Sequence, residues 1–143
     1  MSGANPASTL AWAGPFRIEE VRANRALIPS QPGVYVFTLH PGPLVDSLGV
    51  LYVGKASALS SRLPSYLADP EDIRILSPRK KDGSLNRSLR HAGKNQLLME
   101  IQQKARGGAL SGIWLRWTIR ANPQPLEETM IQFFQPAFNT AGL

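Results

Sequence analysis

The chain has 143 residues, no cysteine, two histidines and a formal net charge of +6. This length is typical of one domain that buries its own core, so we expect a single domain over residues 1–143. The lack of cysteine excludes disulfides, thiol nucleophiles and thiolate metal sites, and it favours a reducing, cytoplasmic location. No run of about 18 apolar residues is present, so the sequence predicts no membrane-spanning helix.

The positive charge is concentrated in one stretch of the chain. Residues 74–106 contain nine basic and two acidic side chains, a net +7, whereas the remainder contains seven basic and eight acidic ones. A local excess of this kind favours binding to a polyanion, because neutralising phosphates releases counterions and supplies affinity that is independent of sequence. A solvated basic surface explains the charge alone equally well.

The N-terminal third predicts an arm followed by a helix. Residues 1–14 are small, polar and interrupted by proline and glycine, which is typical of a flexible arm. Ile18, Val21 and Leu27 recur at near-helical spacing, so we expect a helix over residues 16–27.

Two strands and a second helix follow. Residues 33–39 (GVYVFTL) and 50–54 (VLYVG) are rich in β-branched and aromatic side chains, which favour strands. Their connection contains several prolines and glycines and is too long for a tight hairpin. A helix is predicted over residues 57–67, where Pro64 should kink or delay it.

The C-terminal half predicts a basic insertion, two helices and a third strand. The insertion covers residues 68–110 and includes a helix over 95–105. Residues 113–120 alternate between apolar and polar side chains, which predicts a half-exposed strand, and a last helix is expected over 126–135. The fold class is therefore α+β: a small three-stranded sheet, at least partly antiparallel, flanked by helices.

The last helix carries a carboxylate on its apolar side. At 100° per residue, Glu127 falls inside the apolar stripe, whereas Glu128 lies on the wet face. The stripe consists of Leu126, Met130, Ile131, Phe133 and Phe134. A carboxylate that faces a core destabilises the fold unless an arginine, a metal ion or a proton neutralises it. A buried pair with Arg62, or a side chain that reaches solvent at the edge of the stripe, would be the ordinary structural explanation.

The chain resembles the GIY-YIG nuclease family over about three quarters of its length. GVY at residues 33–35 and YVG at residues 52–54 match the two motifs that name the family, and LEETMIQFFQPAFN resembles its glutamate helix. Five polar side chains stand in the family's order: Tyr35, Tyr52, Arg62, Glu127 and Asn139. Lys55 and Tyr66 match positions of the family's excision-repair incision subunits, to whose nuclease domain the motifs are most similar.

The resemblance implies a metal-dependent endonuclease that hydrolyses phosphodiester bonds in DNA, with RNA not excluded. One Mg²⁺ or Mn²⁺ ion would be held by Glu127, and Arg62 would contact the scissile phosphate. Tyr35 or Tyr52 would accept the proton of the attacking water, with Tyr35 slightly favoured and with help from Lys55. Asn139 would orient the site, and Lys55 and Tyr66 complete the expected catalytic set.

The basic stretch is expected to follow the nucleic-acid backbone and to decide which substrate is held. The predicted contacts are Arg79, Lys80, Lys81, Arg87, Arg90, Lys94 and Arg116. A homodimer or a partner protein would supply specificity. Two alternatives remain open: a nucleic-acid-binding module of the same fold that has lost turnover, and an interaction domain. The interaction domain leaves both Glu127 and the local charge unexplained.

Overall fold

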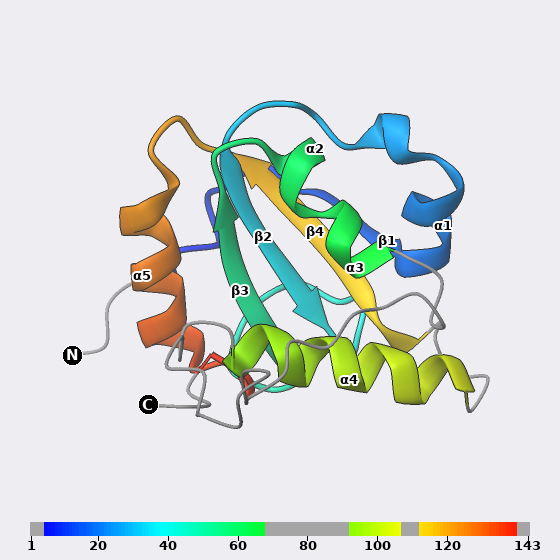
Figure 1. Ribbon diagram of the computed structural model, residues 1–143. Helices are drawn as coiled ribbons and strands as arrows, with labels where there is room; N and C mark the ends of the chain where they lie inside the picture. Colours follow the sequence, from blue (N-terminus) through cyan, green and yellow to red (C-terminus); the bar gives the residue numbers. More distant parts are fainter. Residues whose placement is uncertain (1–4, 68–91, 107–111, 140–143) are drawn as a thin grey trace, which may run out of the picture.

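A four-stranded antiparallel sheet in the order β1-β4-β2-β3 is the framework of the chain (Figure 1). The computed structural model describes residues 5–67, 92–106 and 112–139. The strands are β1 (Ala13–Arg17), β2 (Gly33–Thr38), β3 (Val50–Ala56) and β4 (Trp114–Ile119). The helices are α1 (Ile18–Ala23), the 3-10 helix η1 (Arg25–Leu27), α2 (Leu59–Arg62), α3 (Pro64–Leu67), α4 (Ala92–Arg106) and α5 (Pro123–Phe134). The predicted α+β class is confirmed.

Each face of the sheet has its own apolar cluster. Tyr35 and Phe37 of β2 pack with side chains of α1, α2, α3 and α4 on one face. Val34 and Val36 point to the opposite face, where Met130 and Phe134 of α5 cover them. Because both faces are covered, β2 is buried over its whole length. Figure 1 shows α2, α3 and α4 in front of the sheet and α5 beside β3. No helix in the described ranges is long and apolar enough to cross a bilayer.

The sheet has one strand more than the sequence predicts. The helix expected over residues 16–27 is divided into the end of β1, α1 and η1. β1 was missed because AGPFR has no apolar alternation, and its pairing with β4 changes register between Ala13 and Phe16. Phe16 joins the sheet because its ring packs on Trp117, with a centroid separation of 5.1 Å. A distant contact therefore overrides the local helical spacing.

The flexible arm predicted over residues 1–14 is wrong for its described part. Ala7 is buried in the cluster under α5. The Asn5 side chain donates a hydrogen bond to the Leu44 carbonyl at 2.6 Å, and the Trp12 indole donates to the Ala7 carbonyl at 3.1 Å. These contacts hold residues 5–12 against the sheet, a role that their small and polar composition does not reveal.

The break predicted at Pro64 is confirmed. α2 ends at Arg62, and α3 begins at Pro64. Proline is compatible with the first position of a helix because the N–H that it lacks would have no intrahelical partner there. The same preference explains why α5 begins at Pro123 and not at residue 126 as predicted, since Pro123 and Pro125 both fit its first turn. Arg62 consequently stands exposed at a helix end.

Two motif glycines are required by close approach. A Cβ atom on Gly54 would overlap the ring of Tyr35, which lies opposite it in the β2–β3 pairing. A Cβ atom on Gly33 would overlap the carbonyl oxygen of Thr118 in β4 and approach Leu59 Cδ1 to 2.9 Å. The glycines of GVY and YVG therefore let the strand that carries Tyr35 pack closely on both sides.

We expect Gly54→Ala to lower the free energy of unfolding by about 1–3 kcal/mol, because the added methyl group must displace the Tyr35 ring. Urea unfolding measures this effect. The matched control is Gly112→Ala, since a Cβ atom there meets nothing within 4 Å. Equal unfolding midpoints for the two variants would contradict the close packing of Gly54 and Tyr35.

Candidate active site

A cleft of about 610 Å³ lies beside β3, the strand at one edge of the sheet. Its lining brings together six of the seven predicted catalytic residues and one lysine of the basic set: Tyr35, Tyr52, Lys55, Arg62, Tyr66, Glu127 and Lys94. These side chains come from β2, β3, α2, α3, α4 and α5. Residues that are distant in the sequence therefore converge on one cavity.

Three tyrosines form the inner wall of the cleft. The Tyr35 and Tyr66 hydroxyls share a buried hydrogen bond of 2.9 Å, and these side chains are 1% and 0% exposed. Tyr52 is only half buried, so it is the most accessible of the three. Burial raises the pKa of all three phenols, and Glu127 raises the pKa of Tyr52 further. Each tyrosine is consequently protonated at neutral pH in the free protein.

Glu127 supplies the acidic group of the cleft. It lies in the first turns of α5 and is half buried, whereas the apolar side chains of Leu126 and Met130 on the same helix are buried. Burial raises the pKa of its carboxyl group, whereas the charge of Lys55 opposes this change. The carboxylate forms no hydrogen bond or ion pair with any residue that the structure describes. The pairing with Arg62 that would make Glu127 an ordinary structural residue is therefore absent within those ranges.

Three cations line the cleft together with this carboxylate. Arg62 is exposed at the end of α2, and Lys55 is half buried on β3. Lys94 of α4 places its ammonium group 5.0 Å from the ring centroid of Tyr66, a cation–π contact. Burial lowers the pKa of Lys94, and the neighbouring charge of Arg62 lowers it further. The described lining thus holds three cations and one carboxylate, an excess of positive charge that suits a phosphodiester anion.

Asn139 supports the cleft indirectly, because its side chain binds the backbone of β3. Its amide donates to the Val53 carbonyl at 2.8 Å, and its carbonyl oxygen accepts from the Val53 N–H at 2.7 Å. The preceding residues Ala137 and Phe138 also pair with the edge of β3. Asn139 does not line the cleft, and its hydrogen bonds hold the strand segment between Tyr52 and Gly54.

The basic residues predicted to bind nucleic acid lie in different parts of the chain's structure. Lys94 enters the cleft itself. Arg116 is 4% exposed and pairs with Val36, so it lies on the sheet face opposite Tyr35. Its guanidinium group donates to the Gly42 carbonyl at 2.9 Å, which makes it a support of the β2–β3 connection and not a phosphate contact. Arg79, Lys80, Lys81, Arg87 and Arg90 lie outside the described residues.

The carboxylate of the cleft suits a metal ion that keeps most of its bound water molecules. Among the described residues no group of three or more His, Cys, Asp or Glu side chains comes together. Mg²⁺ is commonly held by one or two carboxylates together with water and substrate phosphate. Glu127 is the one carboxylate that the described residues contribute to the cleft, and its oxygens have no partner among those residues, which fits that kind of binding.

Comparisons with known proteins agree with the motif pattern over part of the chain. The chain is 45% identical over 58 residues to UvrABC system protein C of Halobacterium salinarum, which covers 40% of the chain and 10% of that protein. It is 51% identical over 55 residues to the protein of the same name from Nocardia farcinica, covering 38% of the chain and 7% of that protein. It is 35% identical over 82 residues to UvrABC system protein C of Haloarcula marismortui, which covers 57% of the chain and 13% of that protein.

The chain thus spans about a tenth of the length of the curated relatives that it matches. No protein-family model and no solved structure matches it.

Because the folded-state pKa of Glu127 lies above its ordinary value of 4.5, the folded chain binds this proton more tightly than the unfolded chain does. The contribution of Glu127 to stability therefore falls as the pH rises from 4.5 through the folded pKa. We expect Glu127→Gln to unfold at a higher urea concentration than wild type at pH 7. The gain should be small, since the side chain is only half buried and solvent screens its charge.

The comparison is repeated below pH 4.5, where the wild-type carboxyl group is protonated and the two midpoints should converge. A variant that is less stable than wild type at pH 7 would show that the ionised carboxylate stabilises the fold.

Proposed function

We propose that this chain is a metal-dependent endonuclease of the GIY-YIG type that hydrolyses phosphodiester bonds in DNA. The observation that carries the proposal is the cleft that brings Glu127, whose carboxylate has no hydrogen bond or ion pair within the described ranges, together with Arg62, Lys55 and Lys94. Relatives named UvrABC system protein C support it, since the motifs also resemble excision-repair incision subunits most closely.

The cations of the cleft would bind and orient the scissile phosphate. The exposed fork of Arg62 can contact two phosphoryl oxygens at once, and its charge is permanent. Lys55 and Lys94 would add positive charge on either side. Groups that are already positioned where negative charge develops stabilise the transition state without reorganising. Mg²⁺ or Mn²⁺ held by Glu127 would supply Lewis-acid polarisation of the phosphate and a more acidic bound water.

Burial favours Tyr52 over Tyr35 as the group that accepts a proton from the attacking water. A general base must come within hydrogen-bonding distance of that water. Tyr52 is partly exposed to the cleft, whereas the Tyr35 hydroxyl is already bonded to Tyr66 inside the protein. Because Tyr52 is protonated in the free protein, it must release its own phenolic proton to solvent before it can accept one from the water. Burial and the charge of Glu127 raise the pKa of Tyr52 and oppose this release, whereas the hydrogen bond with Tyr66 and the charge of Arg62 lower it.

The first experiment is cleavage of supercoiled plasmid and of single-stranded DNA with Mg²⁺ or Mn²⁺. We expect metal-dependent cutting that EDTA abolishes. Glu127→Ala should lower the rate by at least ~10²–10³-fold, because it removes a group that acts on the transition state. The matched control is Glu128→Ala, which removes an exposed carboxylate from the same turn of α5 and should keep cutting.

If neither wild type nor the Glu127 variant cuts, while both bind DNA with a steep dependence on salt, the chain is a binding module. Cutting that persists undiminished in Glu127→Ala would show that another group performs the chemistry.

The two tyrosines are distinguished by their phenylalanine variants. We expect Tyr52→Phe to lower the cleavage rate by about 10²–10⁴-fold with unchanged stability, since a general base is lost. Tyr35→Phe should lower the free energy of unfolding by ~1–3 kcal/mol, because it leaves the buried Tyr66 hydroxyl without its partner. Single-turnover rates and urea unfolding give the two quantities. A larger loss of rate in a stable Tyr35→Phe protein would reverse the assignment.

A further inference from the structure

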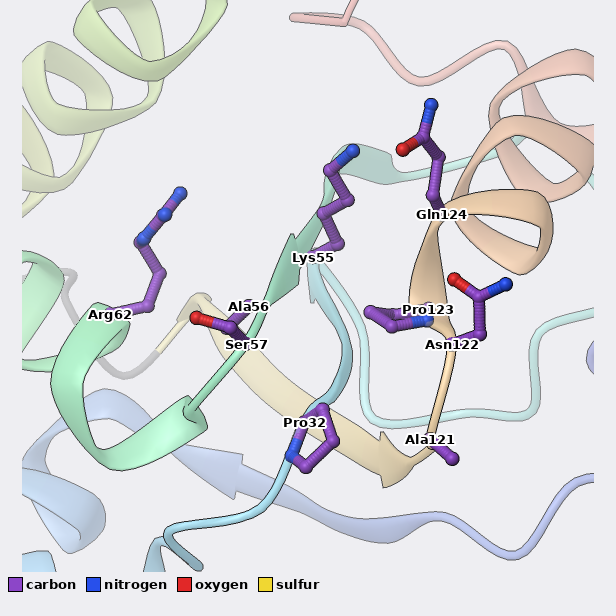
Figure 2. A pocket seen from close by; sticks show the side chains of 9 residues that line it. All are labelled: Pro32, Lys55, Ala56, Ser57, Arg62, Ala121, Asn122, Pro123 and Gln124. Carbon is purple, nitrogen blue, oxygen red and sulfur yellow. The ribbon is translucent and has the colours of Figure 1, made fainter.

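A second pocket of about 490 Å³ adjoins the cleft, and Lys55 and Arg62 line both cavities (Figure 2). Its far wall is the start of α5, with Asn122, Pro123 and Gln124, and Pro32 before β2 closes another side. We call this cavity the α5 pocket. In Figure 2, Lys55 stands between Arg62 on α2 and the side chains of α5.

The α5 wall is unsuited to a phosphate. A helix start usually attracts anions through its unpaired N–H groups. Pro123 and Pro125 occupy the first and third positions of α5, so two of these donors are missing. Positive charge in the α5 pocket is therefore confined to the side formed by Lys55 and Arg62.

The same wall offers flat apolar surface and amide groups. The rings of Pro32 and Pro123 contribute the apolar surface. Asn122 holds the cap position of α5, but its side chain makes no capping hydrogen bond, and within the described part of the chain its donor and acceptor have no partner. Gln124 donates one N–H to Glu128 at 3.1 Å, which leaves its carbonyl oxygen and its other N–H. Amide side chains pair with the edges of nucleobases, and adenine suits them best.

We propose that the α5 pocket receives the base of the nucleotide next to the scissile phosphate, with that base against the proline rings and its edge on Asn122. This assignment rests on the proposed nuclease function, whose scissile phosphate lies on the cations shared by both cavities. A volume of about 490 Å³ falls within the usual range of small-ligand sites and accommodates a nucleoside.

A base can enter the α5 pocket only after it leaves its stack. The substrate is therefore single-stranded or unpaired at this position, since unstacking is least unfavourable in DNA that is already open. The α5 pocket thus makes the cleavage depend on DNA structure and on one flanking base.

The test is a titration of the ¹⁵N-labelled protein with dAMP, dCMP, dGMP, dTMP and inorganic phosphate, followed through the backbone amides by NMR. We expect nucleotides to shift the amides of Asn122 and Gln124 with different affinities for the four bases, and dAMP to bind best. Inorganic phosphate should shift only signals near Lys55 and Arg62.

Two outcomes overturn the proposal. Phosphate that reproduces every nucleotide shift would show an anion site without base recognition. No change at Asn122 and Gln124 with any nucleotide at ~10 mM, ten times a millimolar Kd, would show that no base binds there.

Asn122→Ala should reduce the difference in affinity between dAMP and the weakest nucleotide by about fivefold, the lower end for one amide–base contact. The fold should persist, because the Asn122 side chain makes no capping bond. Gln132→Ala, an exposed amide on α5 outside the α5 pocket, is the control and should keep the wild-type difference. An unchanged difference in Asn122→Ala would remove Asn122 from base recognition.

These titrations need no turnover, so they separate the two proposals. Base-selective shifts in a protein that never cuts DNA would keep the α5 pocket as a nucleotide site and refute the nuclease. Metal-dependent cutting without such shifts would keep the nuclease and refute base recognition at α5.

Discussion

The contact between the Tyr35 ring and the backbone of Gly54 is the constraint on which the cleft depends. It allows β2 and β3 to pair while the Tyr35 ring lies against the backbone of the neighbouring strand. The ring direction then carries the Tyr35 hydroxyl to Tyr66 on α3, which ties that short helix to the sheet. Because α2 and α3 are separated only by Leu63, the same tie fixes where Arg62 leaves the end of α2. The glycine at position 54, which has no side chain, thus sets the geometry of two tyrosines and an arginine.

The cleft places its polar groups where they destabilise the fold. Burial opposes the ionised form of Glu127, and it also disfavours the charged form of Lys94. Neither side chain is needed to fill the core, because Met130 and Phe134 of α5 and Leu97 and Ile101 of α4 already pack there. Groups held at an energetic disadvantage are typical of sites that bind a charged ligand, since the ligand removes the disadvantage. A polyanion accompanied by a cation would neutralise both groups together.

The sequence predicts the α+β class, three of the four strands and six of the residues that line the cleft, since these depend on local patterns and on polar side chains in a recognised order. The rest depends on tertiary contacts. β1 has no periodicity of its own and exists because β4 offers it an edge. The alternation of β4 predicts one solvent-exposed face, but both faces are covered, so Arg116 is buried and donates a hydrogen bond to a backbone carbonyl. Lys94 enters the cleft only because Leu97, Leu98 and Ile101 anchor α4 on the tyrosine face. The roles of the basic residues 79–90 remain predictions.

Lys55 and Arg62 stand between the cleft and the α5 pocket, so neither cation belongs to one cavity alone. On the two proposals above, a DNA strand whose phosphate rests on both of them would have its reacting bond toward Glu127 and one neighbouring base toward Asn122. Recognition of that base would then act on the rate through the phosphate, because a base seated against α5 determines how the phosphate meets Glu127. Removing either cation would weaken both events at once, whereas the neutral amides at the start of α5 would touch only the base. For this reason the amides, and not the cations, separate base recognition from the chemistry of the cleft.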